Sequence, residues 1–210
     1  PKADFSAINS IISSDVSLAK QAIAIIKNNT DLAVNLSAIE VSASDANAIA
    51  KVTSGALTAV IKDGSVAGTL KSIGDVKSTD TITFTTTDKM VKASDLVNLN
   101  DKVDTFGTSS IQKITGEAKD ITSIVKAIAI VGTADVTVSG TITAADVATI
   151  KAAGGSGVLT ANVQAAEADQ LDSSLTTGTA SDELNLVVNG QTALATDLNS
   201  LITKTAGTIK

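Results

Sequence analysis

The strongest constraint on this chain is an internal repeat that keeps its phase from copy to copy. Four short segments align on an aspartate: SDANAI (44–49), SDLVNL (94–99), ADVATI (145–150) and TDLNSL (196–201). The aspartates are Asp45, Asp95, Asp146 and Asp197, at steps of 50, 51 and 51 residues. A second set lies between them: TLKSIGDV (69–76), KDITSIVKAI (119–128) and ADQLDSSL (168–175). The repeating unit is therefore half as long, about 25 residues.

Every unit has the same internal order. It opens with a short alternation of apolar and polar residues, which is typical of a strand with one buried face. The clearest strands are LAVNL (32–36), TITFT (81–85), VTVS (136–139) and LNLVV (184–188). The apolar strand starts are Leu32, Leu57, Ile82, Ile111, Val136, Val158, Leu184 and Ile209, at steps of 22 to 29 residues. A helix of about eight to eleven residues, led by Ser, Thr or Asp, follows each strand.

The recurring aspartates and glycines predict the helix boundaries. Ser94–Asp95 and Thr196–Asp197 are expected to give an oxygen to the first N–H groups of a helix, and a negative charge to its positive end. A glycine near the end of the helix is expected to take the left-handed conformation that terminates it. These glycines are Gly55, Gly107, Gly154 and Gly207.

These signals predict an α/β fold, a βα solenoid of about eight strand–helix coils with a leucine-rich-repeat-like outline. One parallel sheet would be backed by helices, because a unit of about 25 residues buries its apolar face only against its neighbours. We expect a single domain over 1–210, with 1–30 as an N-terminal cap or atypical first coil. Residues 31–210 would be the repeats, continuing beyond the C-terminus or capped by a partner.

Composition removes several function classes. The chain has no His and no Cys, which argues against the usual neutral-pH proton shuttle, thiolate chemistry and disulfides. Its basic residues are all Lys and its net charge is −6, so nucleic-acid binding is not expected. No apolar run is long enough for membrane insertion. The interior must be aliphatic, because Trp and Tyr are absent and Phe occurs three times.

Two segments suggest a family. TALATDLNSLITKTAGTI and ITGEAKDITSIVKA resemble repeats in very long, low-aromatic surface or adhesin-like proteins of marine cyanobacteria and some of their phages. The resemblance covers roughly residues 40–210. It departs from the pattern at Ala145, which stands where Ser or Thr usually precedes the aspartate. The resemblance implies an extracellular structural or attachment role and adds no catalytic residue.

The repeated aspartates and a threonine-rich strand are the first candidate sites. Asp45, Asp95, Asp146 and Asp197 have the ligand chemistry of Ca²⁺ sites, but the chain lacks a D-x-D-x-D-G loop and a glycine-rich nonapeptide. Helix capping explains them better. Thr81, Thr83, Thr85 and Thr87 share one strand face, as in ice-binding solenoids. Other coils lack the pattern, so a solvated β-branched face is the simpler interpretation.

Three further motifs have simpler structural explanations. AAGGSGV (152–158), with Gly154, Gly155 and Gly157, matches neither a phosphate loop nor a dinucleotide fingerprint and is expected to be a turn. The acidic pairs Glu167/Asp169 and Asp182/Glu183 could act as acid and base on a glycoside, but we expect solvated turn charges. Lysines near helix ends are ordinary there; they are Lys51, Lys102 and Lys204. The sequons at Asn28 and Asn35 are near chance frequency.

The sequence therefore predicts a non-catalytic extracellular structural or adhesive repeat protein: a rod, stalk, surface-layer or filament component. It predicts no catalytic, cofactor-binding or metal-binding residue and no cofactor. Expected partners are other copies of the chain or neighbouring repeats end to end, and a cell-surface glycan or receptor. An alternative is a viral fibre or appendage component that binds a host surface. A third is a polysaccharide-acting solenoid enzyme.

Overall fold

The computed structural model describes residues 7–26, 31–127, 134–154 and 157–210. Short strands alternate with short helices, and the strand pairs are parallel. The predicted α/β class, with parallel sheets backed by helices, is thus confirmed. The chain divides into two compact units, Pro1–Asp88 with Asn98–Gly107 and Lys89–Val97 with Thr108–Lys210. The prediction of one domain over 1–210 stays a prediction.

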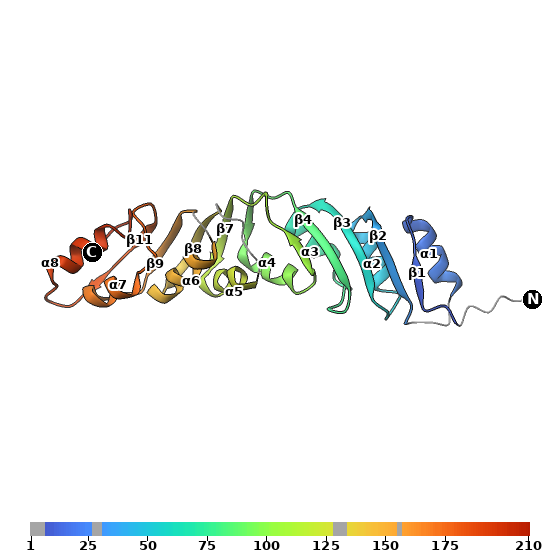
Figure 1. The fold of residues 1–210 in the computed structure, drawn as a ribbon, viewed down its shortest axis with the longest axis horizontal. Coiled ribbons are helices and arrows are strands. Elements are labelled where there is room, and N and C mark those ends of the chain that lie inside the picture. The colour runs from blue at the N-terminus through green and yellow to red at the C-terminus, as the bar shows by residue number, and fades with distance from the viewer. Residues whose placement is uncertain (1–6, 27–30, 128–133, 155–156) are drawn as a thin grey trace, which may run out of the picture. The chain divides into compact units, whose positions relative to one another are not determined.

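Unit 1 contains a five-stranded sheet in the order β1-β2-β3-β4-β6. Figure 1 shows β1, β2, β3 and β4 following one another in this order. Its elements are β1 (Ser10–Ile12), α1 (Val16–Ile25), β2 (Ala33–Val41), α2 (Ala43–Ala50), β3 (Leu57–Gly64), α3 (Val66–Ser72), β4 (Thr81–Thr86) and β6 (Thr105–Gly107). Helix α4 (Ala93–Asn100) has residues in both units. Helices α2 and α3 pack against each other as neighbours. The segment predicted as a cap or atypical first coil therefore contains a strand and a helix, and its strand pairs with β2.

Unit 2 contains a second five-stranded sheet, in the order β11-β9-β8-β7-β5, and a two-stranded sheet of β10 and β12. Its elements are β5 (Met90–Lys92), β7 (Lys113–Glu117), α5 (Ala118–Ala127), β8 (Asp135–Ile142), α6 (Ala144–Gly154), β9 (Leu159–Val163), β10 (Ala166–Glu167), α7 (Ala168–Ser174), β11 (Glu183–Asn185), β12 (Val188–Asn189) and α8 (Ala195–Ile202). Helices α5, α6, α7 and α8 form a row in which each packs on the next.

The sequence offset between paired residues of neighbouring strands is shorter than the predicted repeat of about 25 residues. Paired residues lie 22 or 23 positions apart at the regular parts of both sheets, as in Ser10 with Ala33 and Lys113 with Asp135. Six of the eight predicted apolar starts are nevertheless buried, and Val158 and Ile209 are partly buried. Leu57 pairs with Val34, two residues beyond Leu32, and a shift of two residues keeps a side chain on the same face of a strand. Leu184 pairs with Ala161, three residues beyond Val158, so the buried strand start there is Leu159.

The prediction of one continuous sheet is wrong. The break falls at the longest predicted step, from Ile82 to Ile111. There β4 pairs with β6, whereas β5, which follows β4 after a short connection, pairs with β7. Strands β3 and β8, by contrast, are continuous, and the pairing register shifts part-way along each of them. Here the strand is divided, so its two parts have different partners.

The core is aliphatic, as the composition requires. Along β4 the side chains of Ile82 and Phe84 are buried, while Thr81 and Thr83 face outward. Phe84 stacks on Phe106, with ring centroids 5.7 Å apart and an interplanar angle of 20°. An offset aromatic pair of this kind stabilises the fold by more than the burial of its apolar surface alone. None of the helices in the described residues is both long and apolar enough to cross a bilayer.

Candidate functional site

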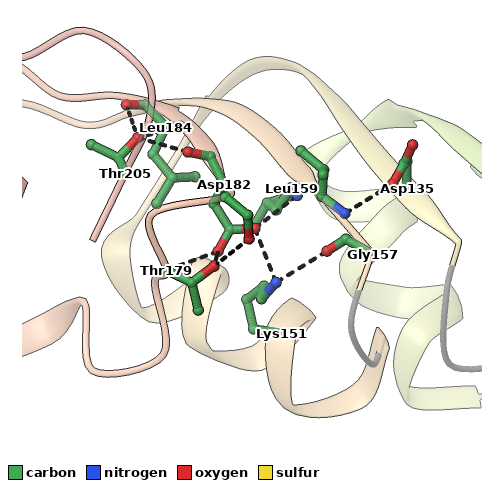
Figure 2. Close-up of polar contacts among 10 residues, drawn as sticks. Asp135, Lys151, Gly157, Leu159, Thr179, Asp182, Leu184 and Thr205 are labelled. Atoms are coloured by element: carbon green, nitrogen blue, oxygen red, sulfur yellow. Dashed lines mark hydrogen bonds and ion pairs between the residues drawn. The ribbon is translucent and has the colours of Figure 1, made fainter. Parts of the chain in front are cut away.

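The most enclosed charged group described is Asp182, in the turn before β11. Its side chain is 0% exposed. One carboxylate oxygen, Oδ1, accepts hydrogen bonds from the Leu159 N–H and from the Lys151 ammonium, both at 2.9 Å. The other, Oδ2, accepts from the Thr179 N–H at 3.0 Å and the Thr179 hydroxyl at 2.9 Å (Figure 2). Both oxygens are therefore engaged by donors from three segments of the chain.

Lys151 completes a buried ion pair with Asp182. It lies on α6, its side chain is 10% exposed, and its ammonium also donates to the Gly157 carbonyl at 3.1 Å. Burial by itself raises the pKa of Asp182. The hydrogen bonds from Leu159, Lys151 and Thr179 outweigh burial, so the pKa lies below the usual 3.8. Asp182 is a carboxylate whose charge is matched inside the protein, and the expectation of a solvated turn charge is wrong for it.

Asp182 belongs to a recurring set that we call the strand-start latch. In each case a side-chain oxygen close to a strand start accepts a backbone N–H from the neighbouring strand. The N–H groups are those of Leu57, Ile82, Val158, Leu159 and Leu184, and the distances are 2.8 to 2.9 Å. The latch residues Asp80, Asp104, Asp182 and Thr205 accept from the preceding unit, whereas Asp135 accepts from the following one. The latch thus bonds one strand–helix unit to the next in both compact units.

Lysines form a second set of connections between neighbouring units. Lys102 donates to the carbonyls of Gly74 and Val76, each at 3.1 Å. Lys204 donates to the Asp172 carbonyl and pairs with its carboxylate at 2.7 Å. Lys77 donates to the Thr53 carbonyl. The hydrogen bond from Lys204, followed by one from Ser200, lowers the pKa of Asp172.

The repeated aspartates lie in the first turn of helices α2, α4, α6 and α8, as predicted. In α2 and α6, however, the capping oxygen comes from a residue three positions earlier. Ser42 accepts the Asp45 N–H at 3.1 Å and donates its hydroxyl to the Asp45 carboxylate at 2.7 Å. Thr143 and Asp146 make the same reciprocal pair, at 3.1 and 2.8 Å. At Thr143 the backbone N–H also donates to the Asp146 carboxylate, at 3.1 Å, which completes a capping box with Asp in the usual Glu position.

Ser94 and Thr196 do not cap their helices as predicted. Helices α4 and α8 begin at Ala93 and Ala195, so both hydroxyl residues lie one position inside the first turn. At α8 the capping position is occupied by Leu194, which makes no side-chain cap bond. In the described parts of the chain, no three His, Cys, Asp or Glu side chains are grouped so as to hold a metal ion.

Two of the four predicted glycines, Gly55 and Gly207, serve close packing and not helix termination, whereas Gly154 is the last residue of α6. Among the described glycines the positive φ values belong to Gly140 and Gly190, at 82° and 102°. A Cβ added at Gly55 would lie 2.4 Å from the Asp31 carbonyl oxygen, and one at Gly207 2.3 Å from the Leu184 oxygen. The chain of one unit passes so close to its neighbour's backbone that a side chain does not fit. Repeated glycine is ambiguous in a sequence, because close approach and left-handed conformation both favour it.

None of the other described candidate side chains bonds to the Asp182 carboxylate. Glu167, Asp169 and Glu183 are exposed, and Glu183 accepts the Thr160 hydroxyl at 3.0 Å. Lys51 is the exposed C-cap of α2. Gly157 lies where an added Cβ would be 2.0 Å from the Ala134 oxygen, so it needs its glycine for close packing. Asn35 pairs with Thr58 on the outer face of β2. Asn28 and Gly155 lie outside the described residues.

The sequence did not predict a hollow on unit 2, which we call the polar groove. It is an open depression of about 440 Å³, lined by residues of β5, β7 and β8 and of the first turns of α4 and α5. Its lining residues are Lys92, Ser94, Thr115, Gly116, Glu117, Lys119, Asp120, Thr137 and Ser139. Glu117 and Lys119 form an ion pair at 3.3 Å. The lining combines hydroxyls with both signs of charge, and is suited to a ligand rich in hydrogen-bonding groups.

This chain matches no protein-family profile, no curated protein sequence and no solved structure.

Proposed function

We propose that the chain is a non-catalytic structural repeat protein whose strand–helix units stack as a βα solenoid. The observation that carries this proposal is the strand-start latch. It joins neighbouring units by the same hydrogen bond in both compact units, at a sequence separation of 21 to 23 residues. A fold that bonds each unit to the next can grow by adding units, which suits a spacer or rod.

The proposed setting is a surface of a cell or virion. Three features support it: the resemblance to repeats of long surface proteins, the absence of Cys, and an acidic composition with a net charge of −6. A rod with evenly spaced coils would carry attachment groups away from that surface. Antibodies against the chain should then label intact cells or particles without permeabilisation. Labelling only after permeabilisation would contradict the surface location.

Duplicating one whole unit tests the stacking. Residues 160–182 form one register step, because Thr160 pairs with Glu183. We expect a chain with this segment repeated in tandem to fold, with the same circular-dichroism signal per residue and an undiminished melting temperature. A matched duplication of residues 160–171 shifts the register by about half a unit and should lower the melting temperature strongly. Equal behaviour of the two chains would overturn the solenoid.

A second candidate function, attachment to a surface glycan, is favoured by the polar groove. Sugars present many hydroxyls, and the groove offers Thr115, Thr137 and Ser139 with charged neighbours. We expect binding to at least one polysaccharide on a glycan array, weakened by Thr137→Val. Thr160→Val is the control, because Thr160 pairs with Thr137 in the sheet but does not line the groove. An equal loss in both variants, or no binding by the native chain, would contradict this function.

A further inference from the structure

Three open depressions on the unit 2 sheet join into one longer hollow. The polar groove shares Glu117, Lys119 and Ser139 with a second depression beside β8. The second shares Thr141 with a third, whose lining includes Asn162 of β9. We call the three together the cross-strand trough. It passes over β5, β7, β8, β9 and β11 in the order these strands have in the sheet, so it crosses the strands and follows none of them.

An irregularity in β8 forms the wall of the trough. The pairs Thr137–Thr160 and Thr141–Asn162 are four residues apart in β8 and two apart in β9, so β8 carries two additional residues there. The additional chain includes Gly140, whose φ of 82° is the left-handed conformation found in many β-bulges. Strand β7, by contrast, passes directly into α5. The longer strand therefore lies beside a shorter one, and the trough follows the difference.

The hydroxyls along the polar part of the trough are not used by the fold. Among the described residues, the side chains of Thr115, Thr137 and Ser139 have no hydrogen-bond partner. Thr160 lies on the same side of the sheet but outside the trough, and its hydroxyl donates to Glu183 at 3.0 Å. Free hydroxyls in a hollow can exchange their bound water for the hydroxyls of a ligand.

The charges in the trough favour a neutral ligand. Glu117 and Lys119 form an ion pair with each other. Asp120 lies in the first turn of α5, where its charge offsets the positive end of the helix. A polyanion would meet Glu117 and Asp120, whereas a polycation would meet Lys92 and Lys119. Because like charges oppose both kinds of polymer, an uncharged ligand is the better match.

The lining also favours a polymer over a protein partner or a single sugar. Ala118 is the largest apolar residue that lines the polar groove or the second depression. A protein partner would find no pocket there for the large apolar or aromatic anchors that dominate protein interfaces. A single sugar would be held by hydrogen bonds alone, without an aromatic ring to stack on. A chain that crosses several strands gains further contacts for one loss of translational freedom.

The spacing of the strands matches an extended glycan. Neighbouring parallel strands lie about 4.8 Å apart. This distance is close to the rise of one sugar ring in an extended β-1,4-linked chain. Thr115 and Thr137 are paired across two such strands, so their hydroxyls repeat at this spacing. The five strands that the trough crosses span about 19 Å from first to last.

We propose that the cross-strand trough binds an uncharged linear polysaccharide in an extended conformation, with successive sugars over successive strands. The proposal rests on the glycan attachment proposed above, and adds the class of glycan and its direction across the sheet. The polar groove alone would hold a short piece of the chain. The second and third depressions would hold its continuation.

Titration calorimetry with oligosaccharides of increasing length tests the proposal. The probes are β-1,4-linked di-, tetra- and hexasaccharides of glucose, mannose and xylose. For at least one sugar we expect the affinity to rise roughly 100-fold from the disaccharide to the tetrasaccharide, because the longer chain adds contacts along the trough. The affinity should not change with salt, since the ligand is uncharged. The α-1,4-linked glucose series is the ligand control: its curved chain should show no gain with length.

Asn162→Ala removes a polar group from the part of the trough that lies beyond the polar groove. It should reduce the gain with length and leave disaccharide binding unchanged. Thr160→Val is the matched control on the same strand, because Thr160 does not line the trough, and it should leave both unchanged. Circular dichroism would show that each variant is folded.

The possible failures are distinguishable. Equal affinity for short and long oligosaccharides would overturn the trough and leave glycan attachment at the polar groove in place. Binding confined to acidic or branched glycans on an array would do the same. An array on which no glycan binds would overturn both the trough and the glycan attachment, and would leave the stacking to the duplication experiment.

Discussion

At the scale of single residues, the Asp182–Lys151 pair is the clearest case of charge held inside this fold. Removing one partner of a buried pair leaves the other without compensation, which typically costs about 3–5 kcal/mol. We expect Asp182→Ala to lower the free energy of unfolding in urea by about this amount. Glu183→Ala, at the exposed neighbouring position, should change it by about 0.5 kcal/mol or less. Similar effects of the two substitutions would show that the pair does not stabilise the fold.

The same pair predicts a pH dependence. The pKa of Asp182 is lower in the folded protein than its usual 3.8, so the unfolded chain binds its proton more readily. The stabilisation is therefore fully present above the unfolded pKa and is lost as pH falls from about 4 towards the folded value. Urea unfolding at a series of pH values should show this loss, and Asp182→Asn should reduce its slope. An unchanged slope in the variant would assign the acid sensitivity to other carboxylates, such as Asp45, whose pKa the Lys20 hydrogen bond lowers.

Close backbone packing gives a second test at single positions. A methyl group at Gly55 would meet the Asp31 and Leu32 backbone at 2.4 to 2.6 Å. We expect Gly55→Ala to destabilise the protein by about 1–3 kcal/mol, the usual cost of overpacking. Gly74 has nothing within 4 Å of the added atom, so Gly74→Ala should cost little. Equal melting temperatures for the two variants would contradict the close approach.

At the scale of helices and strands, the N-cap hydroxyls explain where helices begin. The Thr143 hydroxyl accepts the Asp146 N–H at 3.1 Å, whereas Thr196 lies inside α8. Thr143→Ala should lower the free energy of unfolding by about 1 kcal/mol, the typical value of a lost N-cap. Thr196→Ala should have little effect, although it precedes a repeat aspartate in the same way as Ala145 does. A larger loss for Thr196→Ala would restore the capping role that its sequence suggests.

The strands and their buried faces could be predicted from sequence, because alternation is a local property. Leu57, Ile82 and Leu184 are buried in β3, β4 and β11, as their phase requires. The division of β4 from β5 was not predictable, because it depends on which strand each part pairs with. Asp182 was missed for a related reason. A carboxylate in a turn has the same local pattern whether its donors are water or Leu159 and Lys151.

At the scale of the whole molecule, the proposed stacking predicts that each sheet loses structure from its edge strands first. β1 has one partner strand among the described residues, whereas β3 lies between β2 and β4. We expect amide hydrogen exchange to be fastest in β1 and slowest in interior strands such as β3 and β8. Uniform exchange across these strands would indicate a single cooperative unit. That result would argue against nearest-neighbour stacking.

The offset of 22 or 23 residues between hydrogen-bonded partners also has a mechanical consequence. Within each five-stranded sheet, tension across the strands would load the bonds of one edge strand at a time, so that units would detach singly while the others kept their structure. Each unit of 22 or 23 residues that unfolds would release about 75–80 Å of extended chain. The rod proposed above would then lengthen in steps under load and shorten again when slack.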